Sequence, residues 1–555
     1  MRNDRFPALV VGLLLSATVG TLFTFAEPPA GKPAEPRFTG LGPHRRKVTT
    51  SSDAAQQYFD QGLAFLFGFN HDEAIRSFEA AAAIDPQCAM AFWGIAAANG
   101  PHINNPAVDA AHAKAAWSAL TKARALATAA TKVEQALIEA LAKRYADPQP
   151  AERKPLDEAY AAALSEVWKA YPDDADVGAL TAEAMMDLHP WDQWTLAGEA
   201  QPGTEDVLRI LDEVLARSPK HPLALHLMIH AVEASPHPEK AEAAADRLRD
   251  LEPALGHMVH MPSHIDVRRG RWQDAVTANQ KAIAADAAYR KTMPQQGFYR
   301  VYMAHNFHML AYAAMMQGES KKATEAIEEM LAGIPEDFIK QNAAMIDGFF
   351  AMPYELDMRF GRWDAMLARP KPRDSFPITT ALWHYARGVS FAAKDDVAKA
   401  KSEQQAFAAA VKAVPKGASF AKNTAAAILG VAEKTLDGEI LYREGKADDA
   451  FAAFREAARR EDSLHYIEPP AWIQPVRHAF GAALMDAHRY SDAETVYRAD
   501  LGHYPENGWS LFGLSRSLKM QGKDTEAAAV TVRFDKIWEH ADVKLSSSCF
   551  CLQGR

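Results

Sequence analysis

Cysteine is scarce in this chain of 555 residues, which contains only three. So few thiols exclude a scaffold that is held together by disulfides. Cys88 stands alone, whereas Cys549 and Cys551 form a Cys-x-Cys pair near the carboxyl end. Two thiols one residue apart do not easily bridge each other. We therefore expect this pair to bind a metal ion, to bridge to a partner, or to have no role.

Long apolar segments are absent after residue 26, so nothing later in the chain is predicted to cross a bilayer. Near the start, Arg2 and Arg5 precede an apolar run over 8–25, and the small residue Ala26 follows it at the expected cleavage point, which is the pattern of a signal peptide over 1–26. We therefore expect an exported, periplasmic protein. The alternative is an uncleaved anchor, the one membrane contact that the sequence predicts. The Pro-rich residues 27–50 are predicted to be a disordered linker.

Basic clusters and familiar catalytic motifs are also missing. The chain has 61 basic and 71 acidic residues, a net charge of −10, and no stripe of Lys and Arg, so nucleic acid is not an expected partner. It has no Gly-x-Ser-x-Gly elbow, no phosphate-binding glycine loop, no dinucleotide fingerprint and no His-Glu-x-x-His. Whether the protein is an enzyme therefore stays open at this point.

Small and aromatic residues recur at helical spacing along the chain. Small residues let paired helices approach closely, aromatic residues fill the space between them, and a proline ends the second helix. The first copy consists of Tyr58, Gly62, Phe65, Ala74, Phe78, Ala81 and Pro86. The pattern returns around Gly438 and Gly481. It resembles the tetratricopeptide repeat (TPR), a helix-turn-helix unit of about 34 residues.

The resemblance implies an all-α, TPR-type helix-turn-helix solenoid that winds as a right-handed superhelix. No segment has a convincing strand pattern. Ala241, Ala275 and Ala323 mark the second helices of three central units, and the longer gap before Ala323 predicts an insertion over 289–299. We predict amino-terminal repeats over 51–220, histidine-rich central repeats over 221–335, carboxyl-terminal repeats over 336–541, and a Cys-x-Cys tail over 542–555.

Seven histidines and a glutamate stand out in the central units. A helix turns about 100° per residue, so side chains three, four or seven positions apart share a face. The resemblance implies that positions 2, 5, 9 and 12 of each TPR unit face the concave groove. All eight residues fall at these positions when the three alanines are set at position 20. The residues are His226, His230, Glu233, His257, His260, His264, His305 and His308.

These residues predict a transition-metal site in the groove. First helices of neighbouring units pack about 8–10 Å apart, so their imidazoles can converge on one point. Imidazole and carboxylate ligands suit copper, zinc or iron. The tail thiols Cys549 and Cys551 would join the ligand set if the tail folds back into the groove, and would favour copper or zinc. Such a site is either catalytic or metal-handling.

Two other hypotheses remain. The groove could bind a peptide or protein segment, as the TPR class does, with imidazoles serving as hydrogen-bonding groups. Histidine acid-base catalysis without metal is the third hypothesis.

Some further residues are secondary candidates for the site. Tyr299, Tyr302 and Arg268 would orient a substrate or simply pack, and His102 and His189 are weaker site candidates. Two loops rich in Pro and Trp, 189–194 and 468–475, are expected to line the groove.

A more specific resemblance rests on four strings. They are His226-x3-His230-x2-Glu233, Gly256-His257-x2-His260-Met-Pro-Ser-His264, His305-Asn306-x-His308 and Ser548-Cys549-x-Cys551. Together they are similar to strings in a group of exported bacterial TPR proteins. The resemblance runs from about residue 50 to the end of the chain. It favours a special site without naming a reaction.

Overall fold

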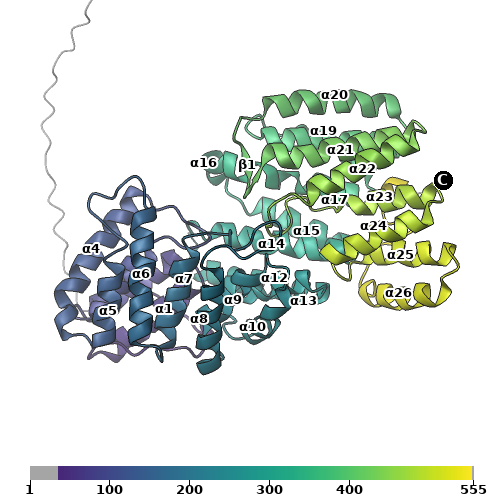
Figure 1. Ribbon diagram of the computed structural model, residues 1–555. Coiled ribbons are helices and arrows are strands. Elements are labelled where there is room, and N and C mark those ends of the chain that lie inside the picture. Colours follow the sequence, from purple (N-terminus) through teal and green to yellow (C-terminus); the bar gives the residue numbers. More distant parts are fainter. Residues whose placement is uncertain (1–34, 295, 553–555) are drawn as a thin grey trace, which may run out of the picture.

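The protein is an almost entirely helical chain of antiparallel helix hairpins (Figure 1). The computed structural model describes residues 35–294 and 296–552. The predicted signal peptide over 1–26 lies outside these residues. Within them, no helix has the length and apolar character needed to cross a membrane.

The amino-terminal half carries the elements up to α13. They are α1 (Asp53–Phe67), α2 (His71–Ile84), α3 (Ala89–Ala98), α4 (Ala110–Leu126), η1 (Ala127–Ala129), α5 (Lys132–Leu141), α6 (Lys154–Ala170), α7 (Ala175–Met186), α8 (Thr204–Arg217), α9 (Pro222–Val232), η2 (Pro238–Ala241), α10 (Glu242–Leu248), α11 (Gly256–His260), α12 (Pro262–Arg268) and α13 (Trp272–Thr292). The predicted insertion near 289–299 is real: α13 is long, and an irregular segment follows it before the next helix.

The remaining elements complete the molecule. They are α14 (Arg300–Met316), α15 (Ser320–Ala332), α16 (Glu336–Ile346), η3 (Asp347–Ala351), α17 (Met352–Arg359), α18 (Trp363–Ala368), α19 (Pro377–Ala393), α20 (Val397–Ala413), β1 (Ser419–Phe420), β2 (Asn423–Thr424), α21 (Ala425–Arg443), α22 (Ala447–Glu461), α23 (Val476–Asp486), α24 (Tyr490–His503), α25 (Gly508–Met520), α26 (Asp524–Ile537) and η4 (Phe550–Leu552). Strands β1 and β2 pair antiparallel. The prediction of no strands missed them, because two residues are too few for an alternating pattern.

Close glycine contacts hold the hairpins together as the repeat pattern predicts. The ring of Phe78 lies between Gly62 and Gly94, where a Cβ atom on either glycine would come within 2.7 or 2.6 Å of it. The ring of Tyr497 lies between Gly481 and Gly513 in the same way, at 2.4 and 2.2 Å. Phe78 and Tyr497, each on the second helix of a unit, therefore pack against the first helices of their own unit and of the next. This packing confirms the all-α, TPR-type fold.

Residues 35–50 are packed, not disordered. Leu41 and Val48 are buried, and the Arg46 guanidinium donates hydrogen bonds of 2.8 Å to the carboxylates of Asp174 and Asp176. The prediction of a disordered linker over 27–50 is therefore wrong for this part. Proline content suggested an unstructured segment, but the apolar side chains and the buried arginine attach it to the first repeats.

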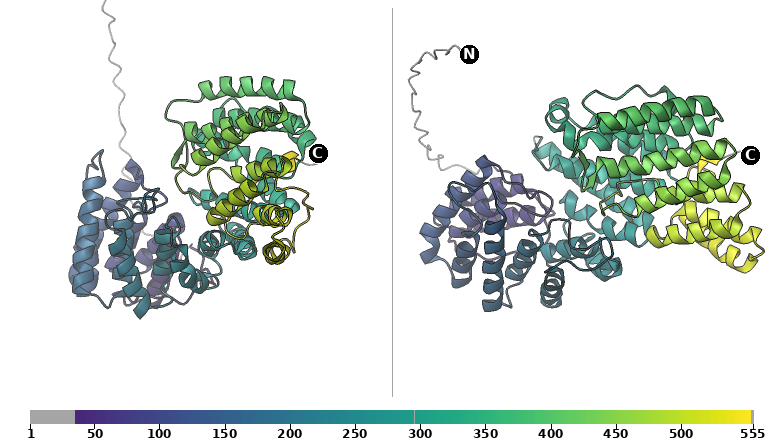
Figure 2. Two further views of the ribbon diagram at one scale, coloured as in Figure 1. Left: turned by 45° about the vertical axis from the view of Figure 1, so that its right-hand side comes forward. Right: turned by 45° about the horizontal axis from the view of Figure 1, so that its top comes forward.

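The carboxyl-terminal hairpin packs back onto the central repeats, so the chain has two lobes joined around α14 (Figures 1 and 2). The indole of Trp509 donates a hydrogen bond of 2.8 Å to the carbonyl of Met315, at the end of α14. The indole of Trp272 donates one of 2.9 Å to the carbonyl of Pro505. The Pro-rich segment 468–475 also reaches the histidine-bearing helices, where Glu468 contacts His264.

Candidate metal centre

The histidines lie on the first helices of three successive hairpins, as predicted. Helix α9 carries His226 and His230, helices α11 and α12 carry His257, His260 and His264, and α14 carries His305 and His308. The alanines used to set the repeat register lie on the following helices: Ala241 in η2, Ala275 in α13 and Ala323 in α15. The periodicity thus located the hairpins correctly.

Six of these imidazoles gather into two adjoining groups of three. His226, His230 and His257 form one group, and His260, His264 and His305 form the other. Within each group, one ring nitrogen from every residue lies within 4.8 Å of the other two. The groups meet where the rings of His230 and His264 lie 5.7 Å apart, centre to centre.

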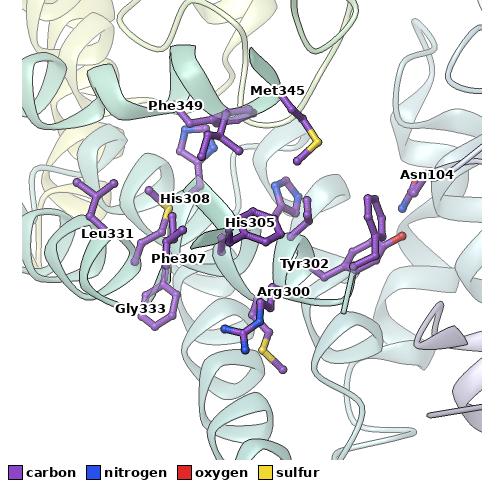
Figure 3. Close-up of a pocket in the computed structure, with 18 of the residues that line it drawn as sticks. Asn104, Arg300, Tyr302, His305, Phe307, His308, Leu331, Gly333, Met345 and Phe349 are labelled. Atoms are coloured by element: carbon purple, nitrogen blue, oxygen red, sulfur yellow. The ribbon is translucent and has the colours of Figure 1, made fainter. Parts of the chain in front are cut away.

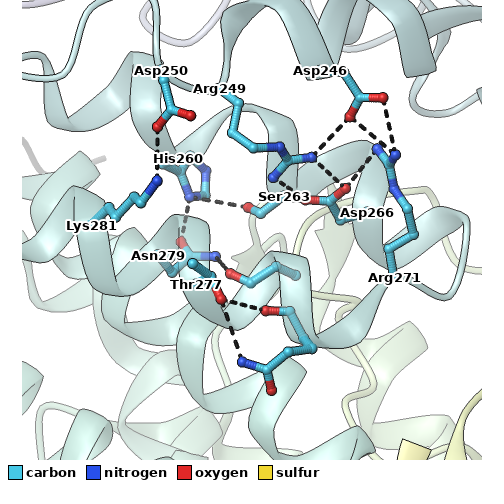
Figure 4. Close-up of polar contacts among 12 residues, drawn as sticks. Asp246, Arg249, Asp250, His260, Ser263, Asp266, Arg271, Thr277, Asn279 and Lys281 are labelled. Atoms are coloured by element: carbon cyan, nitrogen blue, oxygen red, sulfur yellow. Dashed lines mark hydrogen bonds and ion pairs between the residues drawn. The ribbon is translucent and has the colours of Figure 1, made fainter. Parts of the chain in front are cut away.

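Buried acceptors fix two of the rings from behind. The Nδ1 atom of His226 lies 2.9 Å from the carbonyl oxygen of Phe67, at the end of α1. That of His260 lies 2.6 Å from Oδ1 of Asn279 on α13 (Figure 4). The Asn279 amide is oriented by its own hydrogen bond of 2.8 Å to Ala275. Both partners accept, so each Nδ1 carries the proton and each Nε2 presents a lone pair to the centre.

Glu233 fixes two further rings in the same way. Its Oε1 lies 2.9 Å from Nδ1 of His230, and its Oε2 lies 2.5 Å from Nδ1 of His264. The sequence predicted Glu233 as a ligand. These three residues form a further group that could hold a cation. If the Nε2 atoms of both rings bind the metal instead, the Glu233 carboxylate lies behind them, where it would orient the rings and make them more basic.

A second carboxylate, Glu468, also contacts Nδ1 of His264. It belongs to the Pro-rich segment that the sequence expected to line the groove, but it was not predicted as a site residue. Burial and the nearby charge of Glu233 outweigh the opposing effect of His264 and raise the pKa of Glu468 to about 7. No spacing rule could have found this residue, because the return of the carboxyl-terminal half brings it here.

The Nε2 atoms face one another at short distances. His226 and His257 approach to 3.1 Å, and His260 and His264 approach to 2.7 Å. Two lone pairs at such a distance repel unless a proton or a cation lies between them. Between His264 and His260, an Nε2–H of His264 can fill this role, because its two carboxylate neighbours favour the protonated ring. A bound metal ion would take the place of that proton.

Burial keeps most of these rings neutral. It lowers the pKa of His230 to about 3 and the pKa values of His226, His257, His260 and His305 well below the usual value. Neutral imidazole is the form that ligates metals. His264 is the exception: burial lowers its pKa, but Glu468 and Glu233 outweigh this and raise it to about 10.

The site is enclosed and does not lie on an open groove surface as the sequence predicted. Five of the six grouped histidines are at most 5% exposed, and only His305 is half-buried. The ring of Phe69, just after α1, covers His226 at 4.4 Å between ring centres. The first repeat and the segment carrying Glu468 thus close what would be the concave face.

Three predicted ligands lie apart from the two groups. The Nε2 atom of His308 lies 3.1 Å from the sulfur of Met352. Cys549 and Cys551 form a disulfide with each other, although the sequence indicated that such neighbours do not easily bridge. The tail does fold back, but it packs on α19 and α23, and the cysteines lie beside Glu439 and not beside the histidines. Ser548 holds the tail there with a hydrogen bond of 2.9 Å to the carbonyl of His478.

The weaker candidates have packing roles near the centre. The ring of Tyr302 lies 4.6 Å from that of His257, and the Tyr299 hydroxyl accepts a hydrogen bond of 3.2 Å from the His257 backbone. Arg268 donates to the carbonyl of Ser235 at 2.9 Å. His102 packs on Phe69 at 4.5 Å between ring centres. These contacts support the site from outside.

A further group, His44, Asp176 and His221, was not predicted and is already satisfied without a cation. Both histidines place Nε2 within 3.0 Å of one Asp176 oxygen. The other oxygen accepts from the Arg46 guanidinium at 2.8 Å. A neighbouring guanidinium disfavours a metal ion, so we assign this group to packing of residues 35–50.

A cavity of about 650 Å³ opens beside the centre (Figure 3). Its wall includes His257, His264 and His305 from the two groups, together with Glu468. A molecule in the cavity therefore has access to both groups of imidazoles.

Comparison with known proteins adds little beyond the repeat class. No family model matches the chain, and no curated protein matches it. Among solved structures, the human IFIT1 dimer with m7Gppp-AAAA is 12% identical, with 88% of this chain and 91% of that chain covered and a TM-score of 0.32. The APC/C hetero-tetramer Cut9-Hcn1 is 14% identical, with 88% and 78% covered and a TM-score of 0.31.

The TPR domain of P58(IPK) is 11% identical, with 85% of this chain and 99% of that chain covered and a TM-score of 0.21. TM-scores this low show no detailed structural similarity. The assignment of the TPR-type fold therefore depends on the helix packing of this chain. The protein has a TPR-type fold that brings six histidines, five of them buried, together beside a cavity.

Proposed function

We propose that this protein is an exported TPR-type protein with a buried dinuclear transition-metal centre. One observation carries the proposal: two adjoining groups of three imidazoles, each with its ligand nitrogens within 4.8 Å of one another. Each group would supply three ligands to one ion. Three imidazoles leave a fourth position open, as in catalytic sites for zinc.

The proposed ligands are imidazoles, supported by a carboxylate. Imidazole nitrogens suit copper, zinc and iron, and the carboxylate of Glu233 bridges the Nδ1 atoms of one ring from each group. The cysteines are joined to each other, so the thiolate argument for copper or zinc loses its support.

The cavity favours catalysis over metal handling. A metal carrier releases its ion, which is helped by exposed ligands, whereas five of these six rings are buried. Three of the six line the cavity, so a substrate there would reach the open coordination positions. The metal, when bound, would supply a Lewis acid or a redox centre; the surrounding residues hold the rings and exclude water.

Elemental analysis tests the proposal directly. Protein purified without chelator should carry about two transition-metal ions per chain. His230→Ala and His260→Ala should each lose about one ion, and the double variant should lose both. His308→Ala is the matched control and should keep both ions, because its ring contacts Met352. Wild-type protein that stays metal-free after reconstitution with zinc, copper and iron would refute the proposal.

A second candidate function is a scaffold that binds a peptide or protein segment. The repeat fold favours it, because TPR-type hairpins form extended binding surfaces. It predicts that wild-type protein retains a partner with or without chelator, and that the double variant His230→Ala/His260→Ala loses it, because the imidazoles would hydrogen-bond the partner. Loss of capture on adding chelator to the wild-type protein would instead support the metal hypothesis.

A further inference from the structure

The cavity beside the histidines has a wall made largely of aromatic and aliphatic side chains. They come mainly from the start of α14, the end of α15, and α16 with η3 (Figure 3). Five of them are phenylalanines: Phe298, Phe307, Phe338, Phe349 and Phe350. Pockets of about 300–1,000 Å³ with such walls bind drug-sized organic molecules. A volume of about 650 Å³ lies inside that range.

Cationic side chains interrupt this apolar wall. Arg290, Arg300 and Lys422 line the cavity. The Arg300 Nε atom donates a hydrogen bond of 2.9 Å to the carbonyl of Gln296, and the Lys422 ammonium donates one of 2.5 Å to the carbonyl of Pro190. A neutral carbonyl orients each group without cancelling its charge, and the nearby Asp192 carboxylate offsets only part of the charge of Lys422. An anion in the cavity would compensate it.

The two carboxylates on the wall do not cancel this charge. Glu468 lies at the histidine end and contacts the His264 ring. Glu329 is exposed on α15, as Arg290 and Lys422 also are, whereas Arg300 is half-buried, so the wall carries three cationic groups against two carboxylates. The cavity thus combines an apolar wall, excess positive charge and one end formed by His257, His264 and His305.

We propose that the cavity binds an amphipathic organic anion: an apolar alkyl or aryl body with one carboxylate or sulfonate group. The body packs against the phenylalanines, and Arg300 and Lys422 neutralise the anionic group. The inference rests on the proposed function only in that a metal at the histidine end would make this anion its substrate or ligand.

Fluorescent probes test the anion preference. The anionic probe 1-anilinonaphthalene-8-sulfonate and the uncharged probe N-phenyl-1-naphthylamine have similar aromatic bodies. We expect the anionic probe to bind more tightly, and decanoate to displace it at lower concentration than 1-decanol. Arg300→Gln/Lys422→Gln should weaken binding of the anionic probe about tenfold and leave the uncharged probe unchanged. The matched control is Arg247→Gln/Lys412→Gln, at exposed positions on α10 and α20, which should change neither.

A cavity-filling variant locates the bound probe. Ala304→Trp places an indole into the cavity from α14 and should abolish binding of both probes, whereas Ala409→Trp, at an exposed position of α20, should not. Unchanged binding to Ala304→Trp, or equal displacement by decanoate and 1-decanol, would overturn the inference.

Repeating the titration with chelator-treated protein separates the two proposals. If the protein binds the anionic probe with these preferences but holds no metal, the cavity inference stands and the metal centre fails. In cobalt-loaded protein, decanoate should shift the visible absorption spectrum, because the histidine end of the cavity is then occupied. An unchanged spectrum at saturating decanoate would mean that the anion does not reach the centre.

Discussion

At the scale of single residues, the candidate centre depends on the imidazole rings and equally on the hydrogen-bond acceptors that orient them. Asn279 has no place in any histidine string, yet its Oδ1 atom fixes the His260 ring at 2.6 Å. Phe67 and Glu233 do the same for three other rings. Such partners set which nitrogen faces the metal.

Asn279→Ala should therefore weaken metal binding about 10- to 100-fold, the usual cost of losing such a partner. The His260 ring would lose the acceptor for its Nδ1–H and could adopt the other tautomer. Titration of the metal-free protein against a competing chelator measures the affinity. Asn279→Asp keeps an acceptor at the same place and should recover most of it. If both variants bind metal like wild type, the ring is held by packing alone.

At the scale of helices, the repeat pattern works through close approach. Gly481 on α23 faces the ring of Tyr497 on α24, and a Cβ atom there would come within 2.4 Å of the ring. Such an approach is possible only without a side chain. The small residues that the sequence marked are therefore the contacts that set the hairpin spacing.

Gly481→Ala should destabilise the carboxyl-terminal lobe by about 1–3 kcal/mol, because the tyrosine ring must move. Gly502→Ala is a matched control in the next helix, where a Cβ atom would meet nothing within 4 Å. That change should stabilise the protein by about 0.5–1 kcal/mol, since alanine loses less entropy than glycine in a helix. Urea unfolding of both variants measures the difference. Equal effects of the two changes would mean that the lobe has room for the methyl group.

At the scale of the whole molecule, buried carboxyl groups in both lobes make stability depend on pH. Burial raises the pKa of Glu252, in the amino-terminal lobe, to about 8, and does the same for Glu461 in the other lobe. An unfolded chain ionises these groups near pH 4.5. Between the two values the folded protein holds protons that the unfolded chain has lost, so the stability that each group contributes at low pH is lost as pH rises toward 8.

Glu252→Gln isolates one such contribution, because the amide stays neutral. Its free energy of unfolding relative to wild type should rise between pH 5 and pH 8, with a slope of at most about 1.4 kcal/mol per pH unit. Melting curves of both proteins at several pH values give the difference, which removes the effect of all other titrating groups. A difference that is constant across this range would mean that Glu252 is ionised in the folded protein.

The sequence alone determined the fold class and the location of the histidines on first helices. Both follow from local spacing: residues three, four and seven apart share a helix face, and small residues mark where helices touch. His226, His230, His257, His260, His264 and His305 were therefore predictable as one set.

Only the tertiary structure decided how that set is arranged. The return of the carboxyl-terminal half brings Glu468 to His264, the first repeat covers His226, and the turn of α14 that carries His308 points it at Met352. The tail places Cys549 and Cys551 beside Glu439. These contacts join residues far apart in the chain, and their geometry depends on how successive hairpins rotate and close, which no local pattern encodes.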